Sequence, residues 1–184
     1  LYPKRAHYHK YVAHAIPAEE FIDKIRWACS ERDKADPDFV IIARTDTCRF
    51  EGYDEAVKRI NLSAEVGADM GLLFPRNDEE AQRAPKDCDL PLVYVQSRGN
   101  RDGRPTYPMK QLAEMGYAAC IDAQLFLLVS FHFARQALRE MKETGEYTGM
   151  TDEDNVAARQ AIEDLIGLED YYAIEEQTVE EKRW

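Results

Sequence analysis

A short apolar run that ends abruptly in a polar triplet constrains the fold of this chain more than any other feature. Residues 38–46 read Asp-Phe-Val-Ile-Ile-Ala-Arg-Thr-Asp. Five consecutive apolar residues, three of them β-branched, are typical of a strand of a parallel sheet, buried on both faces. The polar triplet then lies at the carboxyl end of the strand, the edge at which barrels and doubly wound folds bind ligands.

Arg44 stands at this edge, where a guanidinium can hold a carboxylate or phosphate through two parallel hydrogen bonds. We therefore expect Arg44 to bind substrate, with an ion pair to an acid of a neighbouring strand as the alternative. Asp46 is expected to orient Arg44 or a loop amide rather than to touch the substrate. Arg76 and Gln96 lie just past two later strands and are predicted to be substrate-binding residues.

Strand signals alternate with helix signals along most of the chain. The predicted strands cover residues 39–43, 70–74, 92–95 and 117–121, and a long helix is predicted over residues 124–144. A repeat of about 25–30 residues predicts parallel βα units with right-handed crossovers. Four strands suit a doubly wound sheet or half of a (β/α)₈ barrel, and periodicity does not choose between them. The start at Leu1 instead of Met favours a piece of a longer protein, and hence half a barrel.

Composition excludes several classes of partner. With 24 Lys and Arg against 35 Asp and Glu, the net charge of −11 argues against binding nucleic acid or anionic membranes. No apolar run approaches the length of about 18 residues that spans a membrane, and no signal peptide opens the chain. The four cysteines are scattered without a C-x-x-C pair, which favours free thiols and a cytoplasmic location.

Motifs along most of the chain resemble the isocitrate lyase/phosphoenolpyruvate mutase superfamily. The A-R-T-D segment, the following G-x-D-E-A helix start and the G-A-D triplet carry the likeness, at residues 43–46, 52–56 and 67–69. Residues 3–5, 91–92 and 112–117 add to it. The resemblance implies a (β/α)₈ barrel, dependence on Mg²⁺ or Mn²⁺, and chemistry on small carboxylic acids through an enolate. The family's metal-binding acids lie on earlier strands, so no metal ligand is expected within this chain.

The same resemblance divides the chain in two. Residues 1–145 correspond to the second half of the barrel, beginning at the loop after strand 4, and residues 146–184 to a C-terminal helical extension. Family members exchange their final helix between subunits. The helix over residues 124–144 carries apolar side chains nearly all round its first half, more than one barrel-facing stripe requires. We therefore expect a homodimer or homotetramer, with the extension packed on a partner subunit.

The mobile loop of the family departs from the lyase pattern here. Isocitrate and methylisocitrate lyases carry K-[KR]-C-G-H, whereas this chain has Ala6 in place of the proton-donating cysteine. Lys4, Arg5, His7 and His9 around it are the candidate catalytic residues of a loop that closes on an anion. A zinc site on the two histidines and plain surface histidines are the alternatives.

Other departures guide the functional prediction. Methylisocitrate lyases place a glutamate near Arg76, and residues 91–96 look closer to the oxaloacetate decarboxylase and phosphonomutase branches, which need no cysteine acid. We expect a Mg²⁺-dependent lyase that cleaves a C–C bond of a 2-oxo or 2-hydroxy di- or tricarboxylic acid. Phosphonopyruvate-type P–C chemistry and a non-catalytic barrel remnant are the alternatives. Residues 97–104 lack the G-x-x-x-x-G-K-[ST] order and are expected to form a flexible, charged connection.

Overall fold

The computed structural model describes residues 14–100 and 102–179. The candidate catalytic residues Lys4, Arg5, His7 and His9, together with Ala6, lie outside the described residues. The chain divides into two compact units, the first ending at Leu125 and the second beginning at Phe126.

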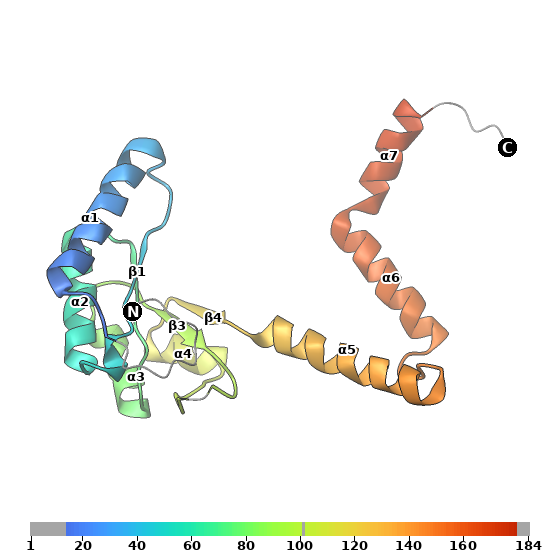
Figure 1. Cartoon of the computed structure of the whole chain (residues 1–184). Helices are drawn as coiled ribbons and strands as arrows, with labels where there is room; N and C mark the ends of the chain where they lie inside the picture. The colour runs from blue at the N-terminus through green and yellow to red at the C-terminus, as the bar shows by residue number, and fades with distance from the viewer. Residues whose placement is uncertain (1–13, 101, 180–184) are drawn as a thin grey trace. The chain divides into compact units, whose positions relative to one another are not determined.

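The first unit alternates strands and helices, as the sequence predicts (Figure 1). In chain order, its elements are α1 (Ala18–Ala35), β1 (Ile42–Arg44), the 3₁₀ turn η1 (Thr47–Arg49), α2 (Tyr53–Glu65), β2 (Met70–Leu72), α3 (Asp78–Asp87), β3 (Val93–Gln96), α4 (Met109–Met115) and β4 (Ala119–Asp122).

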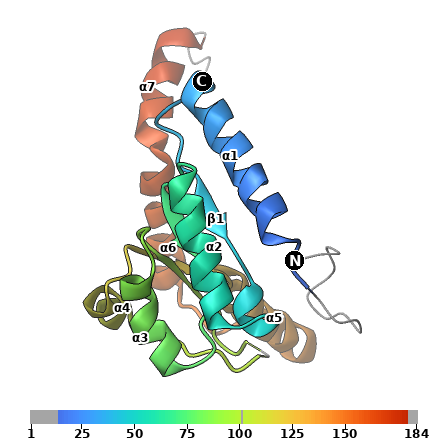
Figure 2. The same ribbon diagram turned by 90° about the vertical axis from the view of Figure 1, so that its left-hand side faces the viewer.

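All the described strands run parallel and follow one another in chain order. β1 pairs with β2 and β3 with β4, and a parallel bridge between Gly71 and Leu92 joins the two pairs. The helices also follow chain order, because α1 packs on α2, α2 on α3 and α3 on α4. Figure 2 shows α2 in front of β1, with α3 and α4 below it. Strands in sequential order with a row of successive helices are the product of repeated βα units.

The core lies between the sheet and these helices. Gly71 and Leu92 share one row of the sheet, and Tyr94 and Cys120 share the next row on the same face. A Cβ atom on Gly71 would lie 2.6 Å from Ile60 Cγ2 and 2.9 Å from Leu92 Cδ2, so the missing side chain lets α2 approach β2 closely. Tyr94 is buried. Its ring makes edge-on contacts with the rings of Tyr117 and Tyr107, whose centroids lie 5.0 and 5.6 Å from its own.

The prediction that residues 39–43 form a strand buried on both faces is wrong in part. Phe39 is 61% exposed, Val40 53% and Ile42 41%, whereas Ala43 is fully buried against the helices. The ladder with β2 begins only at Ile42, because the Asp69 carboxylate accepts the Ile41 N–H at 2.7 Å. β1 is therefore short, and its second face is uncovered by the described residues.

The second unit is helical. α5 (Leu125–Thr144) confirms the long helix predicted from the sequence, and α6 (Asp152–Ile166) and α7 (Leu168–Thr178) follow it. A capping box between Thr151 and Asp154 starts α6, and Gly167, with φ of 66°, ends it in the left-handed conformation. No described residue of these helices is buried, and Phe126 and Phe131 are 83% and 62% exposed. No helix among the described residues is long and apolar enough to cross a membrane.

Candidate functional site

Arg44 lies at the carboxyl end of β1 with its guanidinium held from two sides. Its Nη2 donates to both carboxylate oxygens of Asp46, at 3.1 and 3.3 Å. Its guanidinium carbon lies 4.7 Å from the centroid of the Phe74 ring, a cation–π contact. The side chain remains 57% exposed. The prediction that Asp46 orients Arg44 is confirmed, and the acid that pairs with Arg44 follows its own strand instead of belonging to a neighbour.

The backbone beneath Arg44 is fixed by buried polar contacts. Thr45 N–H donates to the Leu72 carbonyl at 2.9 Å, which extends the pairing of β1 with β2 beyond Arg44. The hydroxyls of Thr45 and Thr47 lie 2.9 Å apart, and both side chains are buried. Since buried hydroxyls need partners, this contact fixes the turn that follows Arg44.

Arg76 follows β2 and is already engaged by the loop after β3. Its Nη1 donates to Asp102 Oδ2 at 2.9 Å and its Nη2 to the Asp102 carbonyl at 2.8 Å. Its backbone N–H donates to Glu80 Oε2 at 2.7 Å, at the start of α3. Partial burial would raise the pKa of Asp102, but the hydrogen bond from Arg76 and the charge of Arg104 outweigh it and lower the pKa. Asp102 is therefore a carboxylate at neutral pH.

Gln96 is buried at the end of β3, and 2% of it is exposed. Gln96 is two residues from Tyr94 on the same strand, so its side chain lies on the same face of the sheet, toward the helices. Arg44 lies on the opposite face. Gln96 Oε1 accepts the Tyr107 N–H at 2.7 Å, which anchors the end of the loop between β3 and α4. A contact between its amide NH₂ group and a substrate stays a prediction.

Arg104 and Phe74 belong to this edge of the sheet and were missed by the sequence analysis. The guanidinium carbon of Arg104 lies 4.8 Å from the centroid of the same Phe74 ring. Arg104 Nε also lies 3.3 Å from Asp102 Oδ2. Strand position alone offers no signal for Arg104, since its place depends on the path of a loop.

Within its described residues, that loop, expected from its sequence to be a flexible, charged connection, contains several hydrogen bonds. Asn100 Nδ2 donates to the carbonyls of Ser97 and Arg104, at 2.9 and 3.0 Å. Asn100 Oδ1 accepts the Arg104 N–H at 2.9 Å. One asparagine thus ties both ends of the loop together, because its amide both donates and accepts.

The described residues contain no group of three or more His, Cys, Asp or Glu side chains that could hold a metal ion. Magnesium requires several oxygen ligands, so the described side chains do not fit a magnesium site by themselves. The cysteines are free thiols, as predicted. Burial raises the pKa of Cys48 to about 11 and that of Cys88 to about 12, which keeps both protonated and unreactive at neutral pH.

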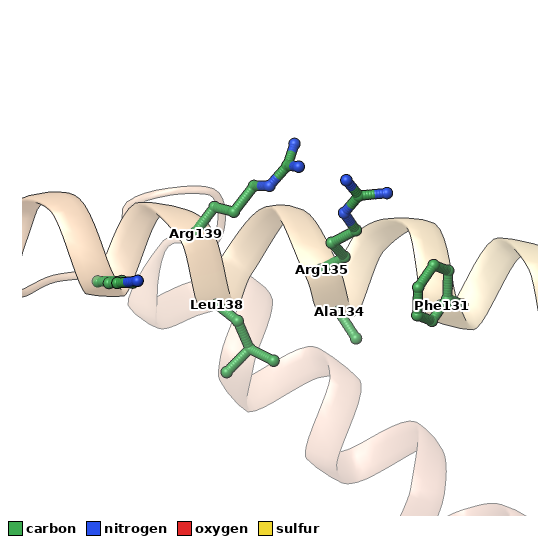
Figure 3. Close-up of a pocket in the computed structure, with 6 residues that line it drawn as sticks. Phe131, Ala134, Arg135, Leu138 and Arg139 are labelled. Atoms are coloured by element: carbon green, nitrogen blue, oxygen red, sulfur yellow. The ribbon is translucent and has the colours of Figure 1, made fainter.

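A separate hollow of about 320 Å³ lies on α5, within the second unit. Figure 3 shows Arg135 and Arg139 pointing to one side of the helix, and Ala134 and Leu138 pointing to the other. Phe131 closes one end of the hollow. Lys142 completes the lining of the hollow, which contains no acid, so we interpret the hollow as part of an uncovered packing face and not as a reaction site.

Comparison with known proteins identifies the family. The family model described as phosphoenolpyruvate phosphomutase matches residues 6–142. The probable 2-methylisocitrate lyase 2 of Corynebacterium glutamicum is 31% identical over 155 residues, which cover 83% of this chain and 48% of that protein.

Solved structures share the fold. A 2,3-dimethylmalate lyase, described as a PEP mutase/isocitrate lyase superfamily member, has a TM-score of 0.76 and 26% identity, covering 88% of this chain and 56% of its own. A phosphonopyruvate hydrolase in complex with oxalate and Mg²⁺ has a TM-score of 0.73, covering 98% of this chain and 60% of its own. Its identity of 23% supports the fold alone.

The chain spans about half the length of the curated relatives it matches. Those relatives are named as lyases and mutases. The family match extends over most of the chain and includes the strand that carries Arg44 and most of α5. This chain therefore belongs to the isocitrate lyase/phosphoenolpyruvate mutase superfamily.

Proposed function

We propose that this chain forms the second half of a (β/α)₈ barrel over residues 1–145, and that residues 146–184 extend it toward a partner subunit. The described residues form four parallel strands in chain order, each followed by a helix, and this supports the barrel over a doubly wound sheet, whose strand order reverses. The uncovered faces of Ile42 and Ile121, 41% and 45% exposed, suit strands that complete a barrel interior with further strands.

The complete protein acts, in this proposal, as a lyase that cleaves a C–C bond of a small 2-oxo or 2-hydroxy di- or tricarboxylic acid and leaves an enolate. Oxaloacetate-type and methylisocitrate-type substrates are the preferred candidates. The observation that carries the proposal is Arg44, an exposed guanidinium at the carboxyl end of β1. Asp46 and Phe74 hold it in place, so it can bind a carboxylate with little loss of side-chain entropy.

A divalent metal belongs to this proposal through the family. The Mg²⁺ in the solved phosphonopyruvate hydrolase supports it, and Mn²⁺ is the alternative. The ligands would come from other parts of the protein, because the described residues do not fit such a site. Bound there, the metal would polarise the 2-oxo group and stabilise an enolate. Lys4, Arg5, His7 and His9 remain candidates for a loop that closes over the substrate, and Arg76 and Gln96 remain candidate binding residues.

Cleavage of a P–C bond is the second candidate. It is favoured by Arg76, a cation where methylisocitrate lyases place a glutamate, since a phosphonate carries more negative charge than a carboxylate. A barrel that no longer turns over any substrate is the third. The free, buried thiols support a reducing compartment, and we place the protein in the cytoplasm.

Substituting Arg44 by Lys tests the proposal. Lysine keeps the charge but loses the planar fork, so we expect the complete protein to lose about 1.5–3 kcal/mol of transition-state binding, or about 10- to 150-fold in kcat/KM. The measurement uses oxaloacetate, 2-methylisocitrate, 2,3-dimethylmalate and phosphonopyruvate with saturating Mg²⁺. The panel also identifies the substrate class.

Arg49→Lys is the matched control, because Arg49 is exposed and also stacks on an aromatic ring, Phe50, at 5.4 Å. It should leave kcat/KM within about twofold, as surface substitutions away from a site do. An Arg44→Lys enzyme as active as the control would remove Arg44 from the substrate site. No turnover of any compound by the wild-type protein would favour the non-catalytic barrel.

A further inference from the structure

Two guanidinium groups from different parts of the chain lie near the Phe74 ring. Arg44 comes from β1, and Arg104 from the loop after β3, with their guanidinium carbons at 4.7 and 4.8 Å from the ring centroid. The two cations are therefore within about 10 Å of each other, on the order of one Debye length at physiological salt. At this separation, an anion bound to one arginine is also attracted by the positive charge of the other.

In the described part of the chain, the three guanidinium groups at this edge have two carboxylates as ion-pair partners. Asp46 pairs with Arg44, and Asp102 is shared by Arg76 and Arg104. A third carboxylate, that of Glu80, accepts the Arg76 backbone N–H at 2.7 Å, so three cations face three carboxylates among the described residues of this edge. Like charges held close together cost free energy unless an anion lies between or beside them. Among the described residues, Arg104 shares its carboxylate partner, Asp102, with Arg76, so its guanidinium is suited to a further anionic group supplied by a ligand.

Donors for that ligand remain on both arginines. Within residues 14–100 and 102–179, Arg44 donates hydrogen bonds through Nη2, which leaves Nε and Nη1 to a ligand. Arg104 contacts Asp102 through Nε and the Val95 carbonyl through Nη1, at 3.3 and 3.4 Å. Its Nη2 has no hydrogen-bond partner in that part of the chain.

Arg104 is also held before any ligand arrives. Asn100 accepts its backbone N–H and donates to its carbonyl, and its side chain is only 11% exposed. Arg98, in the same loop, is 61% exposed and makes a looser contact of 3.6 Å with Asp122. Arg104 is therefore fixed in place by its neighbours, whereas Arg98 is more exposed and less constrained.

We infer that Arg104 is a specificity-determining residue that binds a second acidic group of the substrate, beside the carboxylate held by Arg44. The site then selects dianions, such as dicarboxylates or carboxylate–phosphonates, over monocarboxylates. This inference rests on the proposed role of Arg44. It adds a second anchoring point, from the loop after β3, that sets which acids are accepted.

Calorimetric binding to the complete protein with saturating Mg²⁺ tests the inference without relying on turnover. The probes are 3,3-difluorooxaloacetate, a dianion, and 3,3-difluoropyruvate, which lacks the second carboxylate. Arg104→Met keeps a long, unbranched side chain and removes the charge. We expect this variant to lower the affinity for the dianion by at least about tenfold, the range of a lost charge-assisted hydrogen bond. The affinity for the monoanion should fall by less than about twofold.

Two control variants distinguish the role of Arg104 from the role of Arg44. Arg98→Met should leave both affinities within about twofold. Arg44→Lys should weaken both probes, since both carry the first carboxylate. Equal weakening of both probes by Arg104→Met, or no change in either, overturns the role of Arg104 while the role of Arg44 stands. No effect of Arg44→Lys on either probe, or no binding to the wild type, overturns both.

A measurement on the wild-type protein covers the case in which Arg104→Met does not fold. Two arginines should make the affinity for the dianion fall more steeply with added salt than the affinity for the monoanion. Parallel salt dependences of the two probes would contradict a second anion contact at Arg104.

Discussion

Single residues at this edge of the sheet act through one another. Asp102 holds Arg76 with its carboxylate and its carbonyl, and it also approaches Arg104. Asn100 fixes the backbone on which Arg104 stands. The side chains that would touch a ligand are thus placed by neighbours that would not touch it, which is the usual way of preorganising a binding site.

Asp102 makes this arrangement dependent on pH. Because the pKa of Asp102 is lower in the folded chain than in the unfolded one, its stabilising contribution is present above the unfolded pKa of about 3.9. That contribution is lost as the pH falls through the lower folded pKa. We expect Asp102→Asn to lower the free energy of unfolding by about 1 kcal/mol at pH 7, and by less as the pH falls below about 4.

Urea unfolding followed by circular dichroism at pH 7 and at pH 3 measures this difference. Asp89→Asn, at an exposed position after α3, is the control and should change the unfolding free energy little at either pH. A deficit of Asp102→Asn that is the same at both pH values would mean that the carboxylate charge is not what stabilises the loop.

At the scale of elements, the contact between α2 and β2 depends on the absence of one side chain. A methyl group on Gly71 would come within 2.6 Å of Ile60 and 2.9 Å of Leu92, closer than carbon atoms tolerate. We expect Gly71→Ala to destabilise the protein by about 1–3 kcal/mol through overpacking. The free energy of unfolding in urea checks this value.

A double-mutant cycle identifies the cause. Ile60→Ala removes the Cγ2 atom that Gly71→Ala would meet, so the loss from the two changes together should be smaller than the sum of the single losses. Additive losses would show that the strain arises elsewhere, for example from the Leu92 side.

Sequence patterns predict the order of elements better than their ends or faces. The alternation of strands and helices is confirmed, and so is the long helix that became α5. The start of β1 was misplaced because the Asp69 carboxylate takes the Ile41 N–H, a long-range contact that hydrophobicity does not encode. The direction of Gln96 was readable in principle, since it has the same parity as Tyr94.

The residues of the candidate site also differ in how well the sequence predicts them. Arg44 and Asp46 were predictable because they follow an apolar strand directly, where the backbone direction fixes their place. Arg104 was not, because the Asn100 hydrogen bonds determine where it lies. Where side-chain contacts across a loop fix the position of a residue, that position can be determined only from the structure.

At the scale of the whole molecule, α5 exposes more apolar surface than a stable surface helix carries. Phe126, Phe131 and Phe133 are 83%, 62% and 61% exposed. We expect the complete protein to bury this face in a dimer, or in a tetramer made of two such dimers, with residues 146–184 packed on the partner. The three cations that line the hollow on α5, Arg135, Arg139 and Lys142, suit the acid-rich helices that follow it.

Sedimentation velocity at micromolar concentration measures the association. The wild-type protein should sediment as a dimer or tetramer, and the double variant Phe126→Ser/Phe131→Ser should shift toward the monomer. Glu143→Ser, at an exposed polar position of α5, is the control and should leave the association unchanged. A wild-type monomer would leave the apolar face of α5 without a function.

The row of parallel strands has a practical consequence. Within the described residues, β1 and β4 each have a paired neighbour on one side only, so each presents a line of unpaired backbone N–H and C=O groups. Such edges recognise any strand of matching register. Attached to one half of a split reporter, this chain should signal the presence of the other half of the barrel that we propose, and the same edges should promote inclusion bodies when it is expressed alone.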